Sequence, residues 1–437
     1  MKATLKRLLL AGLCAALLLP AGVIALQLLH DPGSDTPAVA VTDAAMQVRQ
    51  GEYLARVGNC MTCHTSRGGP AYGGGRRIET PFGALYSPNI TPDVANGIGK
   101  WNADDFWRAL HNGKSRDGGF LYPAFPYTEY TRMPRRDSDA LFAYFKTLAP
   151  APLPNRAHAL RFPYDQRLLL AGWRALYFTP GEFKPDPARS AQWNRGAYLV
   201  QGPGHCSACH AARNILGASQ ASVALGLGGG LMPALDWYAP SLTADGEAGL
   251  GSWSEAEIAQ LLKSGVSLQA SVFGPMAEVV AQSLQHLSDD DVAAMAGYLK
   301  SLPPTVQENG PDRMARPDAD PLAEQAMLKR GAKLYEAHCT SCHKEDGRGA
   351  PPAYPPLAGN RAITMTSAVN PIRMVLNGGF APGTGGNPRP YGMPPYGPAL
   401  SDADVAAVVS YIRTQWGNRA AVVSTQEVGR NRAVPVD

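Results

Sequence analysis

Six of the seven cysteines form three pairs, and a histidine directly follows each pair. The motifs have the spacing Cys-x-x-Cys-His and begin at Cys60, Cys206 and Cys339. Two thiols three residues apart lie on one helical turn, where they can form thioethers with the two vinyl groups of a haem while the next imidazole binds the iron. The spacing therefore predicts three covalently bound haem c groups. Their attachment residues are Cys60, Cys63, Cys206, Cys209, Cys339 and Cys342, and the proximal iron ligands are His64, His210 and His343.

Zinc binding and disulfide formation are the alternative interpretations of these cysteines. Structural zinc needs two further ligands near each pair, and more than a hundred residues separate one pair from the next. Three copies of the complete motif favour haem. The seventh cysteine, Cys14, lies in an apolar N-terminal run, where its position favours a plain apolar residue over a lipid attachment site.

The sixth ligand of each iron is expected to be a methionine sulfur or a second histidine. Position in the chain selects Met133, Met276 and Met393. The residues set aside are Met232, Met295, Met365 and Met374, with His111 and His286 as the main rivals and His205 and His338 as expected first-turn helix residues. Methionine ligation raises the haem potential, and six-coordinate irons leave no open site for a substrate. We therefore expect electron transfer and no catalytic residue.

The elements around the motifs repeat. A helical stretch containing Gly51, Gly196 or Gly331 precedes each first cysteine. Glycine weakens a helix by about 1 kcal/mol, so its recurrence predicts a second helix packed closely against the backbone at that point. The second helices are expected over the apolar patterns at 141–145, 295–299 and 408–412. Their starts are marked by Pro134, Ser288-x-x-Asp291 and Ser401-x-x-Asp404.

A proline recurs after each motif, in the steps Pro88-x-Ile90, Pro240-x-Leu242 and Pro355-x-Leu357. The proline carbonyl is a ready acceptor for the ring nitrogen of the haem-ligating histidine that does not bind iron. Such a contact fixes the orientation of the imidazole. Each step alone is ordinary loop sequence, so the prediction depends on the repetition.

The first residues indicate export. Lys2, Lys6 and Arg7 precede an uncharged run over residues 8–29, which is typical of a cleavable signal peptide or of a membrane anchor. Both interpretations place the rest of the chain outside the cytoplasm, because basic residues flank only the N-terminal side. The net charge of +4, without a long basic run, gives no indication of nucleic-acid binding.

The sequence resembles the tri-haem cytochrome c subunits of membrane-bound bacterial dehydrogenases, as in the alcohol, gluconate and sorbitol dehydrogenase complexes. The resemblance spans residues 50–417 and is most specific at 51–64, 80–93, 121–133 and 193–210. It implies an all-α chain of three tandem class I cytochrome c domains. It also implies transfer of electrons from a catalytic subunit oxidising an alcohol, sugar acid or aldehyde to ubiquinone, a terminal oxidase or another respiratory acceptor, on the periplasmic side of the cytoplasmic membrane. Similar subunits accompany molybdenum-dependent oxidoreductases, so the expected partner is a flavin, PQQ or molybdenum dehydrogenase subunit.

The predicted organisation follows the proline-rich stretches. It has a signal peptide or membrane anchor at 1–30, cytochrome c domains at 45–150, 188–303 and 323–418, linkers at 151–187 and 304–322, and a polar tail at 419–437. The first linker contains an apolar helical segment at 167–177, expected to pack against the second domain, with docking to a catalytic subunit or to a membrane as alternatives. Alcohol dehydrogenase cytochrome subunits are thought to anchor through amphipathic C-terminal segments. Because the tail here is polar, anchoring by the N-terminal segment or by a partner is expected instead.

Two other functions compete with this interpretation. A multi-haem peroxidase would need one five-coordinate iron, and a well-placed methionine in each module weighs against it. A free-standing or oxidase-associated electron shuttle is the other alternative. A membrane segment at the N-terminus would restrict the diffusion that a free shuttle requires.

Overall fold

The computed structural model describes most of the chain, namely residues 2–31, 36–37, 42–219, 226–233, 235–245, 248–305 and 320–434. In the first helix, side chains are described at residues 4, 6, 7 and 18–29. The side chain of Cys14, most of the linker predicted at 304–322 and the last residues of the tail lie outside this part of the chain.

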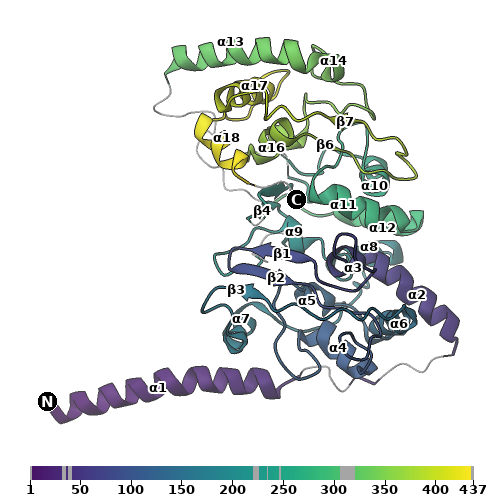
Figure 1. The fold of residues 1–437 in the computed structure, drawn as a ribbon, viewed down its shortest axis with the longest axis vertical. Helices are drawn as coiled ribbons and strands as arrows, with labels where there is room; N and C mark the ends of the chain where they lie inside the picture. The colour runs from purple at the N-terminus through teal and green to yellow at the C-terminus, as the bar shows by residue number, and fades with distance from the viewer. Residues whose placement is uncertain are drawn as a thin grey trace. The chain divides into compact units, whose positions relative to one another are not determined.

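The chain divides into two compact units, which are described separately. The first unit comprises residues 1–186, 200–205 and 215–218. Its elements are α1 (Lys2–Leu29), α2 (Ala44–Val57), α3 (Cys60–His64), β1 (Arg77–Thr80), β2 (Gly83–Tyr86), α4 (Ala103–Asn112), α5 (Tyr127–Tyr130), α6 (Arg135–Thr147), β3 (Ala159–Leu160), the 3-10 helix η1 (Arg167–Leu169) and α7 (Leu170–Tyr177) (Figure 1).

The second unit comprises residues 187–199, 206–214 and 219–437, and it contains the second and third Cys-x-x-Cys-His motifs. Its elements are α8 (Ala191–Gln201, whose last two residues belong to the first unit), α9 (Ser207–His210), β4 (Gly230–Met232), β5 (Trp237–Ala239), α10 (Glu255–Ser264), α11 (Pro275–Gln282), η3 (Leu284–His286), α12 (Asp289–Lys300), α13 (Pro321–His338), α14 (Thr340–His343), α15 (Arg361–Thr364), α16 (Val369–Asn377), β6 (Gly379–Phe380), β7 (Gly392–Met393), α17 (Asp402–Thr414) and α18 (Thr425–Arg432).

The fold is largely helical, as predicted, but three small antiparallel sheets among the described residues depart from an all-α description. Their strand orders are β1-β2-β3, β4-β5 and β6-β7. The first two sheets begin in the glycine-rich stretch after a Cys-x-x-Cys-His motif, whereas the third begins after α16. No strand in them is longer than four residues. Strands this short do not show the alternating apolar pattern by which a sequence reveals a sheet.

Helix pairs form the centre of each repeat, and their backbones come very close. An added Cβ atom would lie 1.9 Å from the Ala140 carbonyl oxygen at Gly51, 2.0 Å from that of Ala294 at Gly196, and 2.2 Å from that of Ala407 at Gly331. The pairs are α2 with α6, α8 with α12, and α13 with α17 (Figure 1). The predicted reason for the recurring glycine is therefore confirmed.

The starts of the second helices also follow the prediction. Ser401 and Asp404 form a reciprocal capping box at α17, and the Ser288 hydroxyl accepts a hydrogen bond from the Asp291 backbone N–H at α12. Pro134 caps α6. The capping carboxylates have a second role, because Arg195 binds Asp291 at 2.7 Å and Arg330 binds Asp404 at 2.6 Å across the helix pair.

The linker helix α7 packs mainly against the first unit. Arg174 is 2% exposed, donates to the Asn112 carbonyl and lies over the rings of Phe120 and Phe178. Trp173 reaches the Leu216 carbonyl at 3.0 Å, in a short segment that the predicted boundaries assign to the second domain but that belongs to this unit. The structure thus differs from the expectation that 167–177 packs on the second domain. The buried arginine and its aromatic neighbours explain the difference.

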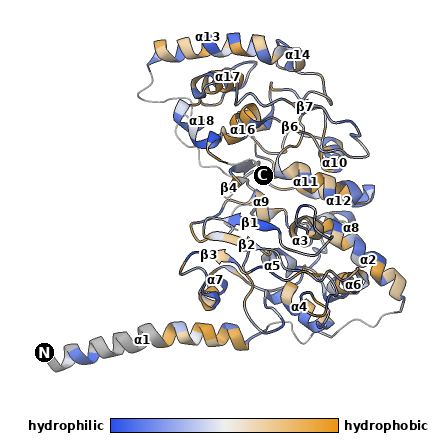
Figure 2. Ribbon diagram, in the orientation of Figure 1, coloured by the Kyte–Doolittle hydropathy of each residue, from blue (hydrophilic) through white to orange (hydrophobic). Residues whose placement is uncertain are grey.

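Helix α1 packs against α7, and its last turn, apolar in Figure 2, approaches a buried lysine. The Lys114 ammonium is 1% exposed, donates to the carbonyl oxygens of Leu28 and His30, and forms an ion pair with Asp31. Within the described residues, no helix combines the length and the hydropathy needed to cross a bilayer.

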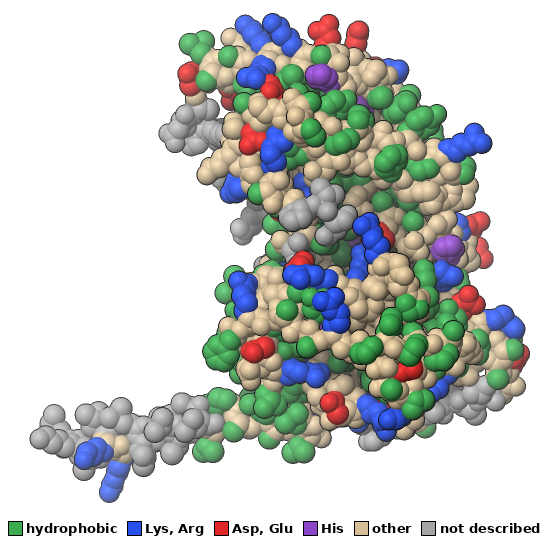
Figure 3. Space-filling view, in the orientation of Figure 1, with side chains coloured by type: hydrophobic (Ala, Val, Ile, Leu, Met, Phe, Trp, Pro, Cys, Tyr) green, Lys and Arg blue, Asp and Glu red, His purple; other side chains and the backbone are tan. Residues whose placement is uncertain are grey.

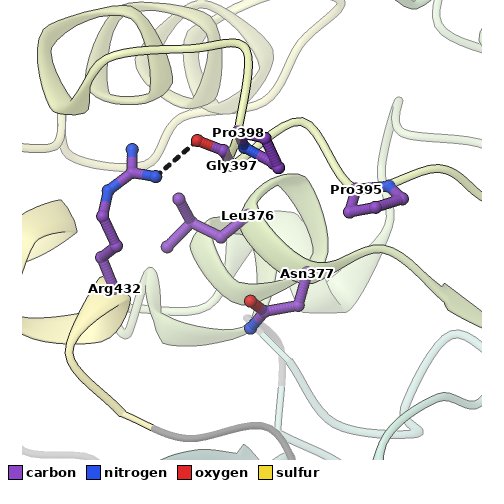
Figure 4. Close-up of a pocket in the computed structure, with 6 residues that line it drawn as sticks. All are labelled: Leu376, Asn377, Pro395, Gly397, Pro398 and Arg432. Atoms are coloured by element: carbon purple, nitrogen blue, oxygen red, sulfur yellow. Dashed lines mark hydrogen bonds between the residues drawn. The ribbon is translucent and has the colours of Figure 1, made fainter.

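The C-terminal segment, predicted as a polar tail, folds back onto the third repeat. Val423 and Val428 are buried in the same apolar cluster as Val405 and Ile412. Arg432 at the end of α18 donates to the carbonyls of Gly397 and Leu400 and pairs with Asp402, beside a shallow pocket (Figure 4). This polar segment therefore forms a helix, α18, which Val428 and Arg432 hold against the third repeat. Val423 is buried just before it.

Candidate haem sites

Each Cys-x-x-Cys-His motif ends in a short helix that places its histidine against a proline. The Nδ1 atom of His64 lies 2.8 Å from the Pro88 carbonyl oxygen, that of His210 lies 2.7 Å from Pro240, and that of His343 lies 3.0 Å from Pro355. The predicted histidine–proline contact is confirmed at all three places. Because Nδ1–H donates to a carbonyl, the other ring nitrogen, Nε2, carries the lone pair that a metal can bind.

The three imidazoles are electrostatically suited to bind iron. Burial lowers the pKa of His64 and of His343, and it lowers the pKa of His210 to about 4. All three side chains are therefore neutral at pH 7, which is the form that binds a metal.

A glycine holds the other side of each histidine. The backbone N–H of Gly74, Gly229 and Gly349 donates to the carbonyl oxygen of His64, His210 and His343, at 2.7, 2.7 and 3.0 Å. All three glycines have positive φ, and a Cβ atom on Gly229 would lie 2.9 Å from the Ala239 carbonyl oxygen, next to Pro240. Each histidine is thus fixed through its backbone and through its ring.

A basic side chain closes the C-terminal end of each motif helix. Arg76 donates to the carbonyl of Thr62 at 2.8 Å, Arg213 to that of Ala208, and Lys344 to that of Ser341 at 3.3 Å. Each acceptor belongs to the residue directly before the second cysteine. Cations stabilise helix C-termini. No local pattern in the sequence marks these three residues, because their spacing from the motif differs at each site.

The partly buried Cys60 and Cys339 do not resemble redox-active thiols. Burial raises the pKa of Cys60 to about 12 and that of Cys339 to about 11. Reactive thiols in disulfide oxidoreductases have lowered pKa values, since the thiolate is the nucleophile. These two thiols are protonated at neutral pH, which does not favour the disulfide-exchange alternative.

In the first repeat, Met133 lies in the apolar core beside the motif. It is 1% exposed and belongs to one cluster with Leu54 and Tyr130, against which Cys60 packs. The Tyr130 hydroxyl donates to the Gly58 carbonyl at 3.2 Å, which ties the segment before Met133 to the segment before Cys60. The structure thus brings Met133 and the first motif into one core.

In the second repeat, an apolar cavity adjoins the motif. Its volume, including the opening to solvent, is about 1030 Å³. Cys209, His210 and Met276 all line it, and Met276 lies in the first turn of α11. A mainly apolar wall with a few polar groups is typical of a cofactor site. Met232, which the sequence argument set aside, lines the same cavity, whereas Met295 is buried inside α12 as expected.

In the third repeat, Met393 lies on β7 and is partly buried. It packs against the apolar cluster that also contacts Cys339, and β7 pairs with β6 directly after α16. Met365 caps the end of α15 and is 2% exposed, and Met374 lies within α16. Met393 thus lies between α16 and α17 and packs against the same cluster as Cys339.

The rival histidines have other contacts. His111 is buried on α4, stacks on Trp107 at 4.3 Å between ring centroids, and lies 3.4 Å from the Thr131 hydroxyl. His205 does not open a helix as expected. It lies in a loop with φ of 39°, and its Nε2 atom is 3.1 Å from the Gly58 carbonyl oxygen.

Two remaining histidines lie at helix ends. His338 is the last residue of α13 rather than the first of a helix. His286 is the last residue of η3. Neither appears among the residues that line the cavity.

The residues present fit a covalently attached haem. Each repeat offers two thiols on one helical turn and a neutral imidazole anchored at Nδ1, and an uncharged thioether side chain lies in the adjoining core or cavity. Imidazole and thioether are known axial ligands of haem iron in cytochromes c. The residues Asn360, Arg361 and Asn370 also line the cavity of the second repeat, and no motif in the sequence marked them.

Comparison with known proteins agrees with this chemistry. The cytochrome c family model matches residues 194–303 and 328–416. These two regions are therefore cytochrome c domains, a class of domain that holds covalently bound haem c.

Comparison over the whole chain is more specific. The chain is 40% identical over 385 residues to the cytochrome c subunit of a quinone-type alcohol dehydrogenase from Gluconacetobacter polyoxogenes, which covers 86% of this chain and 82% of that protein. It is 40% identical over 399 residues to the gluconate 2-dehydrogenase cytochrome c subunit of Pantoea cypripedii, covering 88% and 89%. The chain therefore belongs to the family of dehydrogenase cytochrome c subunits.

Another relative is a longer protein. A nicotinate dehydrogenase subunit of Pseudomonas putida is 42% identical over 382 residues, which cover 86% of this chain and 31% of that protein. The predicted resemblance is confirmed by the relatives named as dehydrogenase cytochrome c subunits. So is the prediction of an electron-transfer subunit rather than an enzyme that acts by itself.

Proposed function

We propose that this chain is a tri-haem cytochrome subunit that passes electrons from a periplasmic dehydrogenase, oxidising an alcohol, sugar acid or aldehyde, to ubiquinone or another respiratory acceptor. The observation that carries the proposal is the histidine between a proline carbonyl and a glycine N–H, which occurs at His64, His210 and His343. The same local structure at three separate motifs supports the same cofactor at each.

The proposed sites are the three motifs with their methionines. The covalent attachment residues are Cys60, Cys63, Cys206, Cys209, Cys339 and Cys342, and the axial pairs are His64 with Met133, His210 with Met276 and His343 with Met393. The first motif lies outside the two regions matched by the family model. Its assignment is supported by the helix pair at Gly51 and by the contact between His64 and Pro88, both repeated in the other two regions.

The proposed organisation is three tandem class I cytochrome c domains, at 45–150, 188–303 and 323–418. Two observations extend the outer domains. The linker residues 151–187 contribute β3 to the sheet of the first unit and α7 to its surface. Helix α18 adds Val428 to the core of the third domain. We therefore place the end of the first domain near residue 186 and that of the third near residue 434.

The roles of the protein residues follow from their contacts. A bound haem c supplies one-electron redox chemistry. The proline carbonyls hold the imidazoles in one tautomer and one orientation, and the apolar cores exclude water. The methionine thioethers would bind the iron of a haem held at each motif. An iron held by both a histidine and a methionine would leave no position for a substrate, so the chain's own residues support electron transfer without catalysis.

The proposed partner and location rest on the relatives and on the surface. The relatives' names include quinone-type alcohol and gluconate 2-dehydrogenases, which supports a separate catalytic subunit and a quinone acceptor. We place the protein on the periplasmic side of the cytoplasmic membrane. The charged and then apolar N-terminus supports this location. So do Leu168, Leu169 and Leu176, which are exposed at α7, the helix that packs against α1. Figure 3 shows hydrophobic side chains gathered at the end of α1.

The number of haems can be tested by removing them one at a time. The paired variants C60A/C63A, C206A/C209A and C339A/C342A are expected to lower the haem content of the purified protein from three to two per chain, measured by the pyridine haemochrome assay and intact mass. Cys14→Ala is the matched control and should retain three. A wild-type protein with two haems, or a paired variant that keeps three, would contradict the proposal.

The axial ligands can be assigned in the same way. Met276→Leu is expected to reduce the iron–methionine absorbance band of the oxidised protein by about one third, because one of three such bonds is lost. Met232→Leu in the same cavity should leave the band unchanged. Rapid reaction of the wild type with peroxide would instead favour the peroxidase alternative.

The partner and the location can be tested with the native protein. Co-purification of the tagged chain should recover a dehydrogenase subunit from the membrane fraction, and the complex should reduce a ubiquinone analogue when the dehydrogenase substrate is added. Recovery of the chain alone from the soluble periplasm would favour the free shuttle.

A further inference from the structure

The cavity beside His210 is closed by residues that follow the third motif. Asn360, Arg361 and Asn370 line the cavity together with Cys209 and His210. The contact is fixed by hydrogen bonds, because the Asn370 side chain accepts from the Tyr238 N–H at 2.9 Å and donates to the Tyr238 carbonyl at 2.8 Å. The segment at 360–370 is therefore part of the wall of the second site.

Arg361 is the cation of this wall. Its Nη1 atom donates to the Ser241 carbonyl at 3.3 Å, a long hydrogen bond, and its guanidinium lies 5.2 Å from the centre of the Trp253 ring. In the described part of the chain, no carboxylate lies within ion-pair distance of this group. Desolvation lowers the pKa of Arg361 to about 10, and an arginine remains charged at pH 7 even so.

Arg361 is partly buried, and a desolvated cation without a counter-ion is unfavourable unless a ligand supplies the opposite charge. The guanidinium offers five N–H donors in a planar fork that matches a carboxylate. The other residues that line the cavity are mainly apolar. Its missing partner is therefore expected to be an anion that enters with the cofactor.

We propose that Arg361 binds a propionate carboxylate of the haem attached at Cys206 and Cys209, so that the third domain supplies part of the second domain's cofactor site. This inference rests on the proposed function, which places a haem at that motif. A fixed positive charge beside a haem disfavours the oxidised, more positive form. Arg361 is accordingly a positioning residue that raises the reduction potential of the second haem.

The test uses the full-length holoprotein and measures three reduction potentials by spectroelectrochemical titration. The C206A/C209A variant lacks the second haem, so the potential missing from its titration identifies that haem. Arg361→Gln is expected to lower this potential and to leave the other two in place. Arg189→Gln is the matched control, since Arg189 stacks on Trp193 at 5.1 Å on the exposed surface, and it should change none of the three.

Arg361→Lys provides a second variant that keeps the charge. An ammonium cannot make the two-pronged contact, so the second potential is expected to fall by less than in Arg361→Gln. If Arg361→Gln does not fold, Arg361→Lys decides alone. An unchanged second potential in the folded variant, or an equal fall in all three potentials, would overturn the proposal.

The haem content of the variants distinguishes a failure of the Arg361 proposal from a failure of the proposed function. If C206A/C209A retains the wild-type haem content, the proposed function fails at the second site. If C206A/C209A loses one haem but Arg361→Gln does not change the second potential, only the role of Arg361 fails.

Discussion

A Cβ atom on Gly196 would lie 2.0 Å from the carbonyl oxygen of Ala294, because α8 and α12 pack backbone against backbone. We therefore expect Gly196→Ala to force the two helices apart. Overpacking of this kind costs about 1–3 kcal/mol, which outweighs the better helix propensity of alanine. The loss should appear as a lower denaturant midpoint for unfolding of the holoprotein, followed by far-ultraviolet circular dichroism. The equivalent changes at Gly51 and Gly331 should act in the same direction.

Gly297→Ala on α12 is the control for Gly196→Ala. A Cβ atom at Gly297 would have its nearest neighbour, a carboxylate oxygen of Glu255, at 3.5 Å, which is an ordinary contact. Here only helix propensity changes, so a stabilisation of up to about 1 kcal/mol is expected. Equal effects of the two substitutions would show that helix approach does not explain the glycine that recurs in the three repeats.

Gly229 tests the local structure that holds His210. Its φ is 85°, and an added Cβ atom would lie 2.9 Å from the Ala239 carbonyl oxygen and 3.0 Å from the Pro240 carbonyl carbon. Gly229→Ala should displace the Pro240 carbonyl and weaken its hydrogen bond from His210. We expect a destabilisation of about 1–3 kcal/mol and a change in the midpoint potential of one haem.

Gly68→Ala separates the backbone strain at Gly229 from the clash. Gly68 has a φ of 73°, and a Cβ atom added there would have no neighbour within 4 Å. Alanine at this position adds only the cost of a left-handed backbone, about 1 kcal/mol. All haem potentials should stay in place. If Gly68→Ala and Gly229→Ala have the same effect on stability and on the potentials, the Gly229 contact has no role in orienting His210.

The sequence predicted the parts of this structure that repeat. Glycine, the Cys-x-x-Cys-His motif and the proline step each recur three times, and this recurrence is informative where a single residue is not. The contacts at Gly331 and Pro355 agree with the prediction. The methionines are placed near their motifs, but the sequence had no means of excluding Met232, which lies in the same cavity as Met276.

Other features have no local signal. The buried Arg174 that holds α7 on the first unit is an ordinary arginine in an apolar segment, and the tail that contains Val428 has a polar composition. Arg361 lies far along the chain from His210, although the two line one cavity. Contacts between segments that are distant in the sequence depend on the folded structure, so local sequence patterns do not predict them.

The acid stability of the first unit should depend on His111. Burial lowers the pKa of this histidine to about 4, below its ordinary value of 6.5. Between these two pH values the unfolded chain takes up a proton that the folded chain does not. The unfolding free energy therefore decreases as the pH falls through this window, by about 3 kcal/mol at most, and the contribution is fully present only above pH 6.5.

His111→Gln should remove that dependence. The difference in unfolding free energy between wild type and His111→Gln, measured by denaturant titration, is expected to be smaller at pH 4.5 than at pH 7. His338→Gln changes an exposed histidine and should leave the pH profile as it is in the wild type. A wild-type-to-variant difference that is independent of pH would mean that His111 does not resist protonation.

Arg413 should stabilise both the C-terminal segment and the end of α15, because its guanidinium is hydrogen-bonded to each. Its guanidinium is buried and donates to the Ala421 carbonyl at 2.9 Å, to Ile363 at 2.8 Å and to Met365 at 3.0 Å. Arg413→Met would leave these carbonyls without their donor, at a cost of about 3 kcal/mol or more. Faster amide hydrogen exchange is expected in both α15 and α18.

The control for Arg413→Met is Arg430→Met, which removes an exposed arginine from α18 and should leave exchange in α15 unchanged. The comparison also bears on Arg361, the first residue of α15. If Arg413 holds α15 in position, Arg413→Met should lower the potential of the second haem as well, in the direction expected for Arg361→Gln. Faster exchange in α15 with no change in that potential would mean that the position of α15 does not control the charge beside the second site.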